Sequence, residues 1–259
     1  MRTLALWSLS ALVVSGCINQ DFPNTQSNLN ERAQQPILNG RADNSRQAVV
    51  SISGGRSSCT GVIVQTNVNS GTGWVLTAAH CVSNRTRFVL QGNDSNDPDR
   101  RYNVTDSTVH PAYDGAGFDF AVVQFSGANG STPVIPLVGA SDGLQRGTTV
   151  TSIGYGQTER GDNSRRNQIS IDIEQLTDEV IVYDQTDSGI CFGDSGGPVI
   201  ATINGNERVV GIHSGVENED CSGNAISGRV SGVYSSWLQG VLSGNLGESC
   251  DLCRQVAVS

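Results

Sequence analysis

Short runs of valine, isoleucine and threonine recur along this 259-residue chain, separated by clusters of glycine, asparagine, aspartate and serine. β-Branched residues favour strands, and the small polar residues between them favour turns. Six such runs lie at residues 48–52, 61–64, 73–77, 149–153, 197–201 and 208–212. Long helical periodicities are few, so the pattern predicts an all-β fold. One short helix is expected near the C-terminus, where Trp237, Leu238, Val241 and Leu242 are spaced by three and four residues.

The segment at residues 191–198 has the sequence CFGDSGGP. Ser195 stands among glycines, which allow the backbone N–H groups of Gly193 and Ser195 to point at one spot. Two such donors stabilise an oxyanion, so the segment predicts a nucleophilic serine. The competing interpretation is a tight structural turn.

A nucleophilic serine needs a general base and a carboxylate that orients it. His80 follows an apolar run and precedes Cys81, where a rigid strand would hold it as the base. Asp119 begins a second apolar run that predicts a buried strand, and a buried carboxylate is costly unless something accepts its charge. The alternatives are a core histidine and a carboxylate that caps a strand, with Asp114 nearby.

The chain order His80, Asp119, Ser195, with these flanking residues, resembles the chymotrypsin/trypsin family of serine endopeptidases over roughly residues 37 to 245. The resemblance implies two antiparallel Greek-key β-barrels with the active site in the cleft between them and a boundary near residues 130–140. It implies hydrolysis of protein or peptide substrates through an acyl-enzyme, with no cofactor and no metal. The alternative is a catalytically inactive, protease-like binding lipoprotein.

The resemblance also implies a substrate pocket. Its residues would be Gly189, Phe192, His213, Ser214, Gly215, Val216 and Gly232. Gly189 lies where trypsin-like members carry aspartate, so no preference for arginine or lysine is expected. Val216 favours small aliphatic side chains, whereas His213 resembles the histidine of bacterial glutamate-specific relatives. Both preferences stay open, as does a core role for His213.

The cysteine count is odd, at seven, and one lipid-modified cysteine would leave six for pairing. The resemblance implies two disulfides, Cys59–Cys81 beside the histidine and Cys191–Cys221 beside the serine. Cys250 and Cys253 form a C-x-x-C motif in the tail at residues 246–259. A local disulfide is favoured there over a redox pair or half of a zinc site, because no second metal-ligand pair accompanies it.

Residues 1–17 resemble a bacterial lipoprotein signal. A basic start precedes a largely apolar stretch from Leu4 to Val14, and a small-residue box ends in Cys17. The pattern predicts export to the cell envelope and lipid attachment at Cys17, with plain secretion as the alternative. Residues 18–36, rich in asparagine and glutamine, are expected to form a flexible tether or propeptide.

Ile37 begins a segment resembling the new N-terminus that zymogens of the family acquire on cleavage. In the family its ammonium group pairs with the aspartate before the serine, here Asp194. Gln35 and Pro36 stand where a basic residue is usual, so self-activation by a tryptic specificity is not expected. Cleavage would also release the enzyme from its lipid anchor. Alternatively, Ile37 simply starts the first strand.

The net charge of −9 argues against nucleic acid as a partner, because phosphates are bound through lysine and arginine. The acidic segment at residues 93–99 offers oxygen ligands of the kind that calcium prefers. Its spacing matches no calcium loop, so a solvated turn is favoured.

Overall fold

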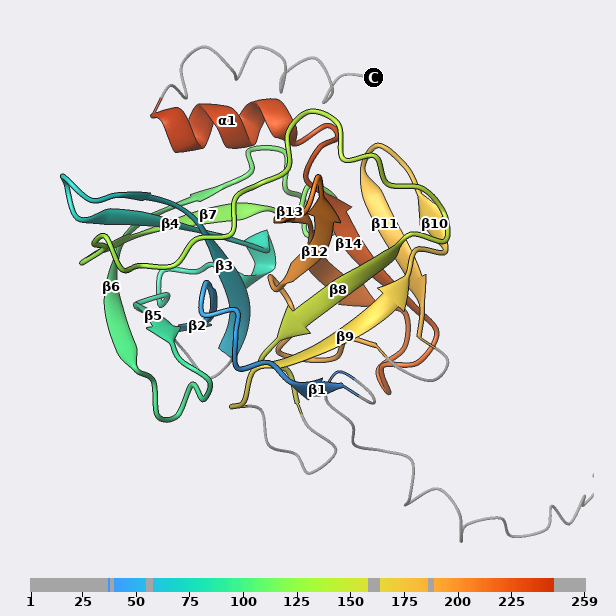
Figure 1. The fold of residues 1–259 in the computed structure, drawn as a ribbon, viewed down its shortest axis with the longest axis horizontal. Coiled ribbons are helices and arrows are strands. Elements are labelled where there is room, and N and C mark those ends of the chain that lie inside the picture. The colour runs from blue at the N-terminus through green and yellow to red at the C-terminus, as the bar shows by residue number, and fades with distance from the viewer. Residues whose placement is uncertain (1–36, 38–39, 55–57, 158–163, 186–188, 245–259) are drawn as a thin grey trace, which may run out of the picture. The chain divides into compact units, whose positions relative to one another are not determined.

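The computed structural model describes residues 37, 40–54, 58–157, 164–185 and 189–244. Predictions for the signal segment, the tether, Cys17 and the C-x-x-C tail lie outside these residues. The described part is nearly all-β, with fourteen strands, one 3-10 turn and one α-helix (Figure 1). The expected all-β class is confirmed.

The first half of the chain forms a closed antiparallel barrel in the strand order β2-β3-β4-β7-β6-β5. Its strands are β2 (Val49–Ser53), β3 (Ser58–Asn67), β4 (Thr72–Thr77), β5 (Phe88–Gln91), β6 (Arg100–Val109) and β7 (Ala121–Ser126). A Cβ atom at Gly73 would lie 2.1 Å from the Phe125 ring. Glycine on β4 therefore makes room for an aromatic ring that fills the barrel.

The second half, joined by β1 from before the barrel, forms a sheet in the order β1-β9-β8-β12-β13-β14-β11-β10. Its strands are β1 (Arg41–Ala42), β8 (Thr149–Gly154), β9 (Asn167–Asp172), β10 (Gln175–Leu176), β11 (Val180–Asp184), β12 (Pro198–Ile203), β13 (Asn206–Val216) and β14 (Asn224–Arg229). Between β9 and β10, Glu174 N donates to Val182 O of β11 at 2.9 Å. The sheet therefore curls back on itself, as a second barrel of this fold requires.

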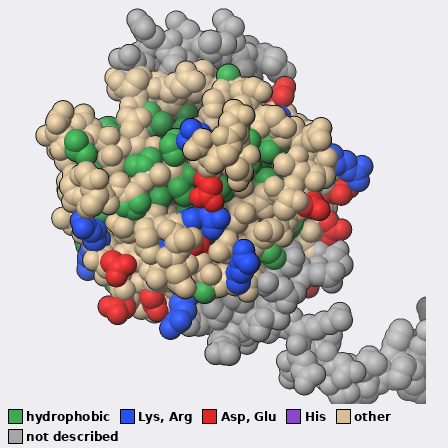
Figure 2. Space-filling model, viewed as in Figure 1, with side chains coloured by type: hydrophobic (Ala, Val, Ile, Leu, Met, Phe, Trp, Pro, Cys, Tyr) green, Lys and Arg blue, Asp and Glu red, His purple; other side chains and the backbone are tan. Residues whose placement is uncertain are grey.

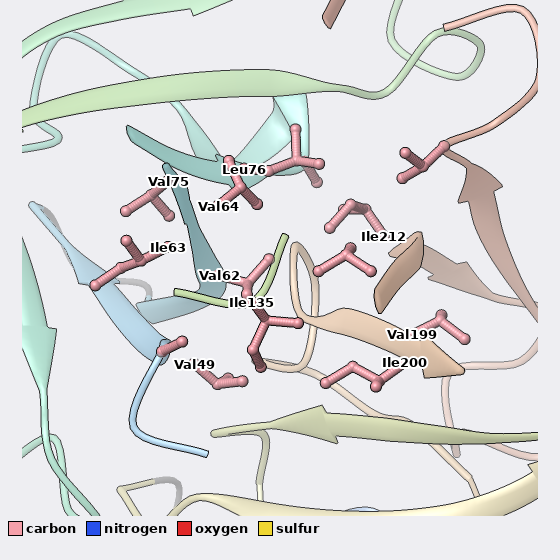
Figure 3. Close-up of a cluster of buried hydrophobic side chains, with 14 of the residues drawn as sticks. Val49, Val62, Ile63, Val64, Val75, Leu76, Ile135, Val199, Ile200 and Ile212 are labelled. Atoms are coloured by element: carbon pink, nitrogen blue, oxygen red, sulfur yellow. The ribbon is translucent and has the colours of Figure 1, made fainter. Parts of the chain in front are cut away.

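The segment at residues 127–148, which contains the predicted boundary at 130–140, connects the barrel to the second sheet. Ile135 N donates to Ile63 O of β3, and Val138 N donates to Val209 O of β13, each at 3.0 Å. The connecting segment is thus hydrogen-bonded to both halves. Ile135 also belongs to a cluster of buried side chains that continues from Val62 of β3 to Val199 of β12 (Figure 3).

The predicted C-terminal helix is α1 (Ser235–Ser243). It buries Trp237, Leu238 and Val241, and Gln65 Nε2 of β3 donates to Leu242 O at 3.0 Å. Gly244 ends the helix with a φ of 77°, the left-handed conformation that glycine tolerates best. Within the described ranges, no helix is both long and apolar enough to traverse a lipid bilayer.

The face in Figure 2 carries hydrophobic side chains near its middle, and its charged side chains lie in small groups of mixed sign. Among the ion pairs of the described residues, Arg46 binds Glu207 at 2.7 Å and the buried Asp43 at 3.0 Å. This face therefore presents no extended basic area of the kind that nucleic acid requires.

A buried ion pair fastens the connecting segment to β14. Arg229 donates from Nε and Nη2 to the two carboxylate oxygens of Asp142, each at 2.7 Å, and Ser231 Oγ donates to the same carboxylate. Burial raises the pKa of Asp142, but the hydrogen bonds from Arg229, Ser231 and Leu144 N outweigh it and lower the pKa to about 2. The pair therefore stabilises the fold at neutral pH.

We expect Asp142→Ala to lower the free energy of unfolding by about 1.5–3 kcal/mol, because it removes the charge-assisted hydrogen bonds from Arg229 and leaves that side chain with Thr177 O and the exposed Asp178. Because the folded pKa is below the ordinary 3.8, the contribution of Asp142 is complete above about pH 4 and disappears as the pH falls toward 2. Urea unfolding monitored by circular dichroism at pH 7 measures the loss.

The control is Glu174→Gln, which breaks an exposed pair with Arg146 and should cost at most about 1 kcal/mol. Equal losses in both variants would contradict this.

Candidate active site

His80 lies in a 3-10 turn, η1 (Ala79–Cys81), directly after β4. Its side chain is 35% exposed, so the imidazole is open to solvent on one side. The predicted disulfide Cys59–Cys81 is confirmed and ties this turn to β3. The two sulfur atoms lie close to the His80 ring nitrogens, but they are bonded to each other and are not thiolates that would bind a metal.

Asp119 orients the His80 imidazole. Its Oδ2 lies 2.7 Å from His80 Nδ1, its Oδ1 accepts the His80 backbone N–H at 3.0 Å, and Ser214 Oγ donates to Oδ2 at 2.6 Å. Burial raises the pKa of Asp119, but the hydrogen bonds from His80 and Ser214 outweigh it, so the pKa is lowered. An ionised carboxylate only accepts hydrogen bonds, so Nδ1 carries the proton and Nε2 is left as an acceptor.

The rings on either side of Asp119 hold it in place. Phe120 packs on β14, where a Cβ atom at Gly228 would lie 2.3 Å from the ring. Phe118, with a φ of 54°, stacks on His110 at 4.9 Å between ring centroids, and His110 meets Trp237 edge-on at 4.8 Å. Burial lowers the pKa of His110 to about 4, so this histidine is neutral at pH 7. His110 thus packs as an aromatic ring in the support of the Asp119 loop.

Ser195 lies in the turn before β12 of the second sheet, against the first barrel. Thr60 N of β3 donates to Ser195 O at 2.9 Å. A Cβ atom at Gly196 would lie 2.1 Å from Thr77 Oγ1, three residues before His80. Gly196 has a φ of 80°, so glycine is needed here for both conformation and space. The half-buried serine and the turn that carries His80 are therefore neighbours across the two halves.

Hydrogen bonds hold the carbonyl groups of the two peptides that contain the Gly193 and Ser195 N–H groups. Phe192 O accepts from Gln157 N, and Asp194 O accepts from Gly197 N, each at 2.8 Å. In a trans peptide the N–H points opposite to the carbonyl, so Gly193 N–H and Ser195 N–H both point away from these bonds. Within the described part of the chain, neither N–H is used in a hydrogen bond. Two free donors therefore flank the serine.

Asp194 is fully buried next to this segment. Its carboxylate accepts from Gly156 N at 2.8 Å and from Cys191 N at 2.9 Å, and burial raises its pKa to about 7. In the described ranges, no arginine or histidine forms an ion pair with it. The predicted disulfide Cys191–Cys221 is confirmed and holds this segment against the residues before β14.

Three segments meet beside Ser195. Gly196 N donates to His213 O of β13 at 2.8 Å, and Gln185 N donates to Gly223 O at 2.7 Å. A Cβ atom at Gly189 would lie 2.0 Å from Gln185 Oε1, so Gly189 rests on a neutral amide. The structure thus brings Gly189 and residues 190–192 together with the end of β13, as expected for a pocket.

The predicted third side of this pocket needs correction. β13 pairs with β14, His213 opposite Ser227 and Val216 opposite Ala225. Gly232 lies elsewhere, since its Cβ position would be 1.5 Å from Asp178 O, beyond the other end of that pairing. The strand segment from Ala225 to Ser227 therefore stands where Gly232 was expected. Nothing in its residue types signals this role, and only the strand register reveals it.

His213 is fully buried beside this segment. Its Nδ1 lies 2.9 Å from Ser227 Oγ, while Nε2 has no hydrogen-bond partner in the described residues. Burial lowers the pKa of His213 to about 3, so the ring is neutral at pH 7. Phe192, in contrast, is half exposed at the rim.

Comparison with known proteins identifies the family to which this chain belongs. The family model described as Trypsin matches residues 38–238. The chain belongs to the trypsin family of serine endopeptidases. It is 26% identical to chymotrypsin-like elastase family member 1 of Felis catus, over 92% of this chain and 98% of that protein. It is 27% identical to the Homo sapiens protein of the same name, over 90% of this chain and 100% of that protein. Trypsin iota of Drosophila melanogaster is 29% identical over 61% of this chain and 68% of its own length.

Proposed function

We propose that this chain hydrolyses peptide bonds with Ser195 as nucleophile, His80 as general base and Asp119 as the carboxylate that orients it. The observation that carries the proposal is the hydrogen bond of 2.7 Å between Asp119 and His80 Nδ1, which leaves Nε2 as a proton acceptor. Ser195 Oγ attacks the substrate carbonyl carbon, and its proton passes to Nε2. The oxyanion is stabilised by Gly193 N–H and Ser195 N–H.

The second half of the reaction returns the proton. His80 protonates the leaving amine as the C–N bond breaks, which leaves the acyl group on Ser195. Water then attacks the ester carbonyl and gives a proton to His80 Nε2. The bond between the acyl carbon and Ser195 Oγ breaks, and Oγ takes up that proton. No other co-reactant is needed.

A fluorophosphonate probe tests the proposal on the processed protein. Serine endopeptidases are phosphonylated at the nucleophile, so peptide mapping should find the adduct on Ser195. The adduct should be absent after heat denaturation, because the reaction needs the assembled site. An inactive, protease-like binding protein would remain unlabelled and would cleave no peptide.

The end of β13 that extends beyond its pairing with β12 at Ile212 is the proposed binding site for the substrate backbone. Gly215 is exposed at the end of this strand, and Ser214 beside it reaches Asp119. An extended peptide that adds to a sheet edge gains main-chain hydrogen bonds at regular spacing. Residues 214–216 would thereby align the scissile bond with Ser195.

We propose a preference for small aliphatic side chains before the scissile bond. Val216 and Ala225 are cross-strand partners in the wall of the proposed pocket. Gly189, which lies next to the neutral Gln185 amide, supplies no charge that would attract arginine or lysine. The relatives named as elastases agree with this preference. A peptide-library profile should show alanine and valine ahead of phenylalanine and arginine. Val216→Gly should shift the profile toward phenylalanine by about tenfold, because it removes one side chain from the pocket wall.

A glutamate preference is the second candidate. His213 Nε2 is buried without a partner in the described residues, so a substrate carboxyl group that displaced its cover would find an unused hydrogen-bonding nitrogen there. The neutral ring would provide a hydrogen bond but no charge. Glutamate at the head of the library profile, lost in His213→Leu, would replace the aliphatic assignment.

We propose that cleavage before Ile37 activates the enzyme. A series of contacts leads from β1 to Asp194. Ala42 of β1 pairs with Asn167 of β9, which also pairs with Gly154 of β8. A Cβ atom at Gly154 would lie 2.1 Å from Asp194 Oδ1. Ile37, itself fully buried, is close in sequence to this chain of contacts. A new ammonium group would give the buried Asp194 carboxylate the cation that it lacks.

The sequence makes this activation measurable, because it contains no lysine. The α-amine of Ile37 would then be the one primary amine of the cleaved enzyme. Reductive methylation should leave it unmodified in the active enzyme and modify it after unfolding in urea. Ready methylation of the folded enzyme without loss of activity would contradict the pairing with Asp194.

We also propose that the chain is exported and anchored through a lipid on Cys17. The two disulfides of the described part support an oxidising compartment. If activation removes residues 1–36, it also removes the anchor. N-terminal sequencing of active protein in the membrane fraction tests this, since an active species that begins at Cys17 would contradict release on activation.

A further inference from the structure

Thr60 of β3 is fully buried, and all its polar groups are bonded to residues around the nucleophile or the turn of His80. Its N–H donates to Ser195 O at 2.9 Å, and its carbonyl accepts from Thr77 Oγ1 at 2.8 Å. Its hydroxyl lies 2.8 Å from Gly193 O and 3.0 Å from Tyr155 N. One residue of the first barrel thus bonds to the carbonyl groups of both residues whose N–H groups form the proposed oxyanion site.

The direction of these hydroxyl bonds follows from the groups involved. A backbone N–H only donates, so Tyr155 N–H must donate to the Thr60 oxygen. A carbonyl only accepts, so the single hydroxyl proton must go to Gly193 O. The hydroxyl rotor therefore has one orientation that satisfies both neighbours.

This bond completes the restraint of Gly193. The peptide before Gly193 is held by the bond from Gln157 N to Phe192 O, and the peptide after it is held by Thr60 Oγ1. Gly193 has a φ of 99°, and glycine rotates more freely than any other residue. Without the bond from Thr60 Oγ1, the Gly193–Asp194 peptide would be held only by the bond from Asp194 N to Cys191 O at 3.0 Å, so the link between the two proposed donors could tilt.

We infer that the Thr60 hydroxyl is a positioning group for the oxyanion site: from the opposite barrel it fixes the Gly193–Asp194 peptide, which links the two proposed donors, and ties this peptide to the end of β8. The inference rests on the proposed function. Thr60 touches neither substrate nor Ser195 Oγ in this role, so it acts on the transition state through Gly193. Its removal should therefore lower kcat and leave KM nearly unchanged.

The test compares Thr60→Val with Thr60→Ser in the processed enzyme. Thr60→Val keeps the shape and removes the hydroxyl, and it should lower kcat by about 10- to 100-fold, somewhat less than the loss of an oxyanion donor. Thr60→Ser keeps the hydroxyl and should stay within about threefold of the unaltered enzyme, with KM within about twofold in both. Exhaustive fluorophosphonate titration counts the competent sites, so kcat is expressed per site.

Thr132→Val is the matched control. Its buried hydroxyl accepts from Asn129 N in the connecting segment, far in sequence from Gly193. It should lower thermal stability without changing kcat per site. Thr60→Ala provides a second variant if Thr60→Val does not fold.

Two outcomes overturn the inference and leave the proposed function intact. One is an unchanged kcat per site in Thr60→Val or Thr60→Ala, which would make Thr60 merely structural. The other is an equal loss in Thr60→Ser, which would show that the methyl group and not the hydroxyl matters. Failure of the proposed function looks different, because the unaltered enzyme itself would then not be labelled.

Discussion

Ser195→Ala is expected to lower kcat for peptide hydrolysis by about 10⁵- to 10⁶-fold, because no other group then forms the acyl-enzyme. The fold should persist, since the contacts of this residue in the structure are made by its backbone, as in the bond from Thr60 N to Ser195 O. Hydrolysis of the best library peptide and fluorophosphonate labelling measure the loss. Both should disappear together.

The control for this substitution is Ser131→Ala, an exposed serine of the connecting segment. It should retain activity within about twofold, as surface substitutions generally do. Labelling that persists in Ser195→Ala would place the nucleophile at another residue. Hydrolysis that persists without labelling would indicate a different chemistry altogether.

Asp119→Asn is expected to lower kcat at neutral pH by about 10⁴-fold. The asparagine amide can donate to His80 Nδ1, which would select the tautomer with the proton on Nε2. That tautomer cannot accept the proton of Ser195. The side chain keeps its size, so the contacts with Phe118 and Phe120 should survive and circular dichroism should be unchanged.

The matched control is Asp114→Asn, a few residues earlier on the same loop. Asp114 is exposed and accepts from Ala116 N and Gly117 N, a local turn that asparagine also supports. It should keep activity within about twofold. A large loss in Asp114→Asn with little change in Asp119→Asn would reverse the assignment of the two carboxylates.

Most strands that bury β-branched side chains could be predicted from the sequence, although β11, which buries Ile181, was not, and strands that expose polar side chains could not. All six apolar runs lie in strands, among them β2, β8 and β12. β6 was not predicted because most of its side chains are exposed. β9 was not predicted because none of its side chains is buried. Their hydrogen bonds to neighbouring strands determine them, and that information is not local.

The same distinction applies to the site. Ser195, His80 and Asp119 each stand in a short motif whose residue types announce their chemistry. Thr60 does not, since its partner Gly193 is 133 residues away and a threonine on a strand is ordinary. The wall at Ala225 could be recognised only from the register between β13 and β14.

The hydrogen bond from Ser214 to Asp119 has a consequence for how the chain is made. During synthesis the first barrel emerges with the base and its carboxylate, while the attacking hydroxyl, its two donors and Ser214 still await translation. A partly made chain therefore holds no complete hydrolytic apparatus.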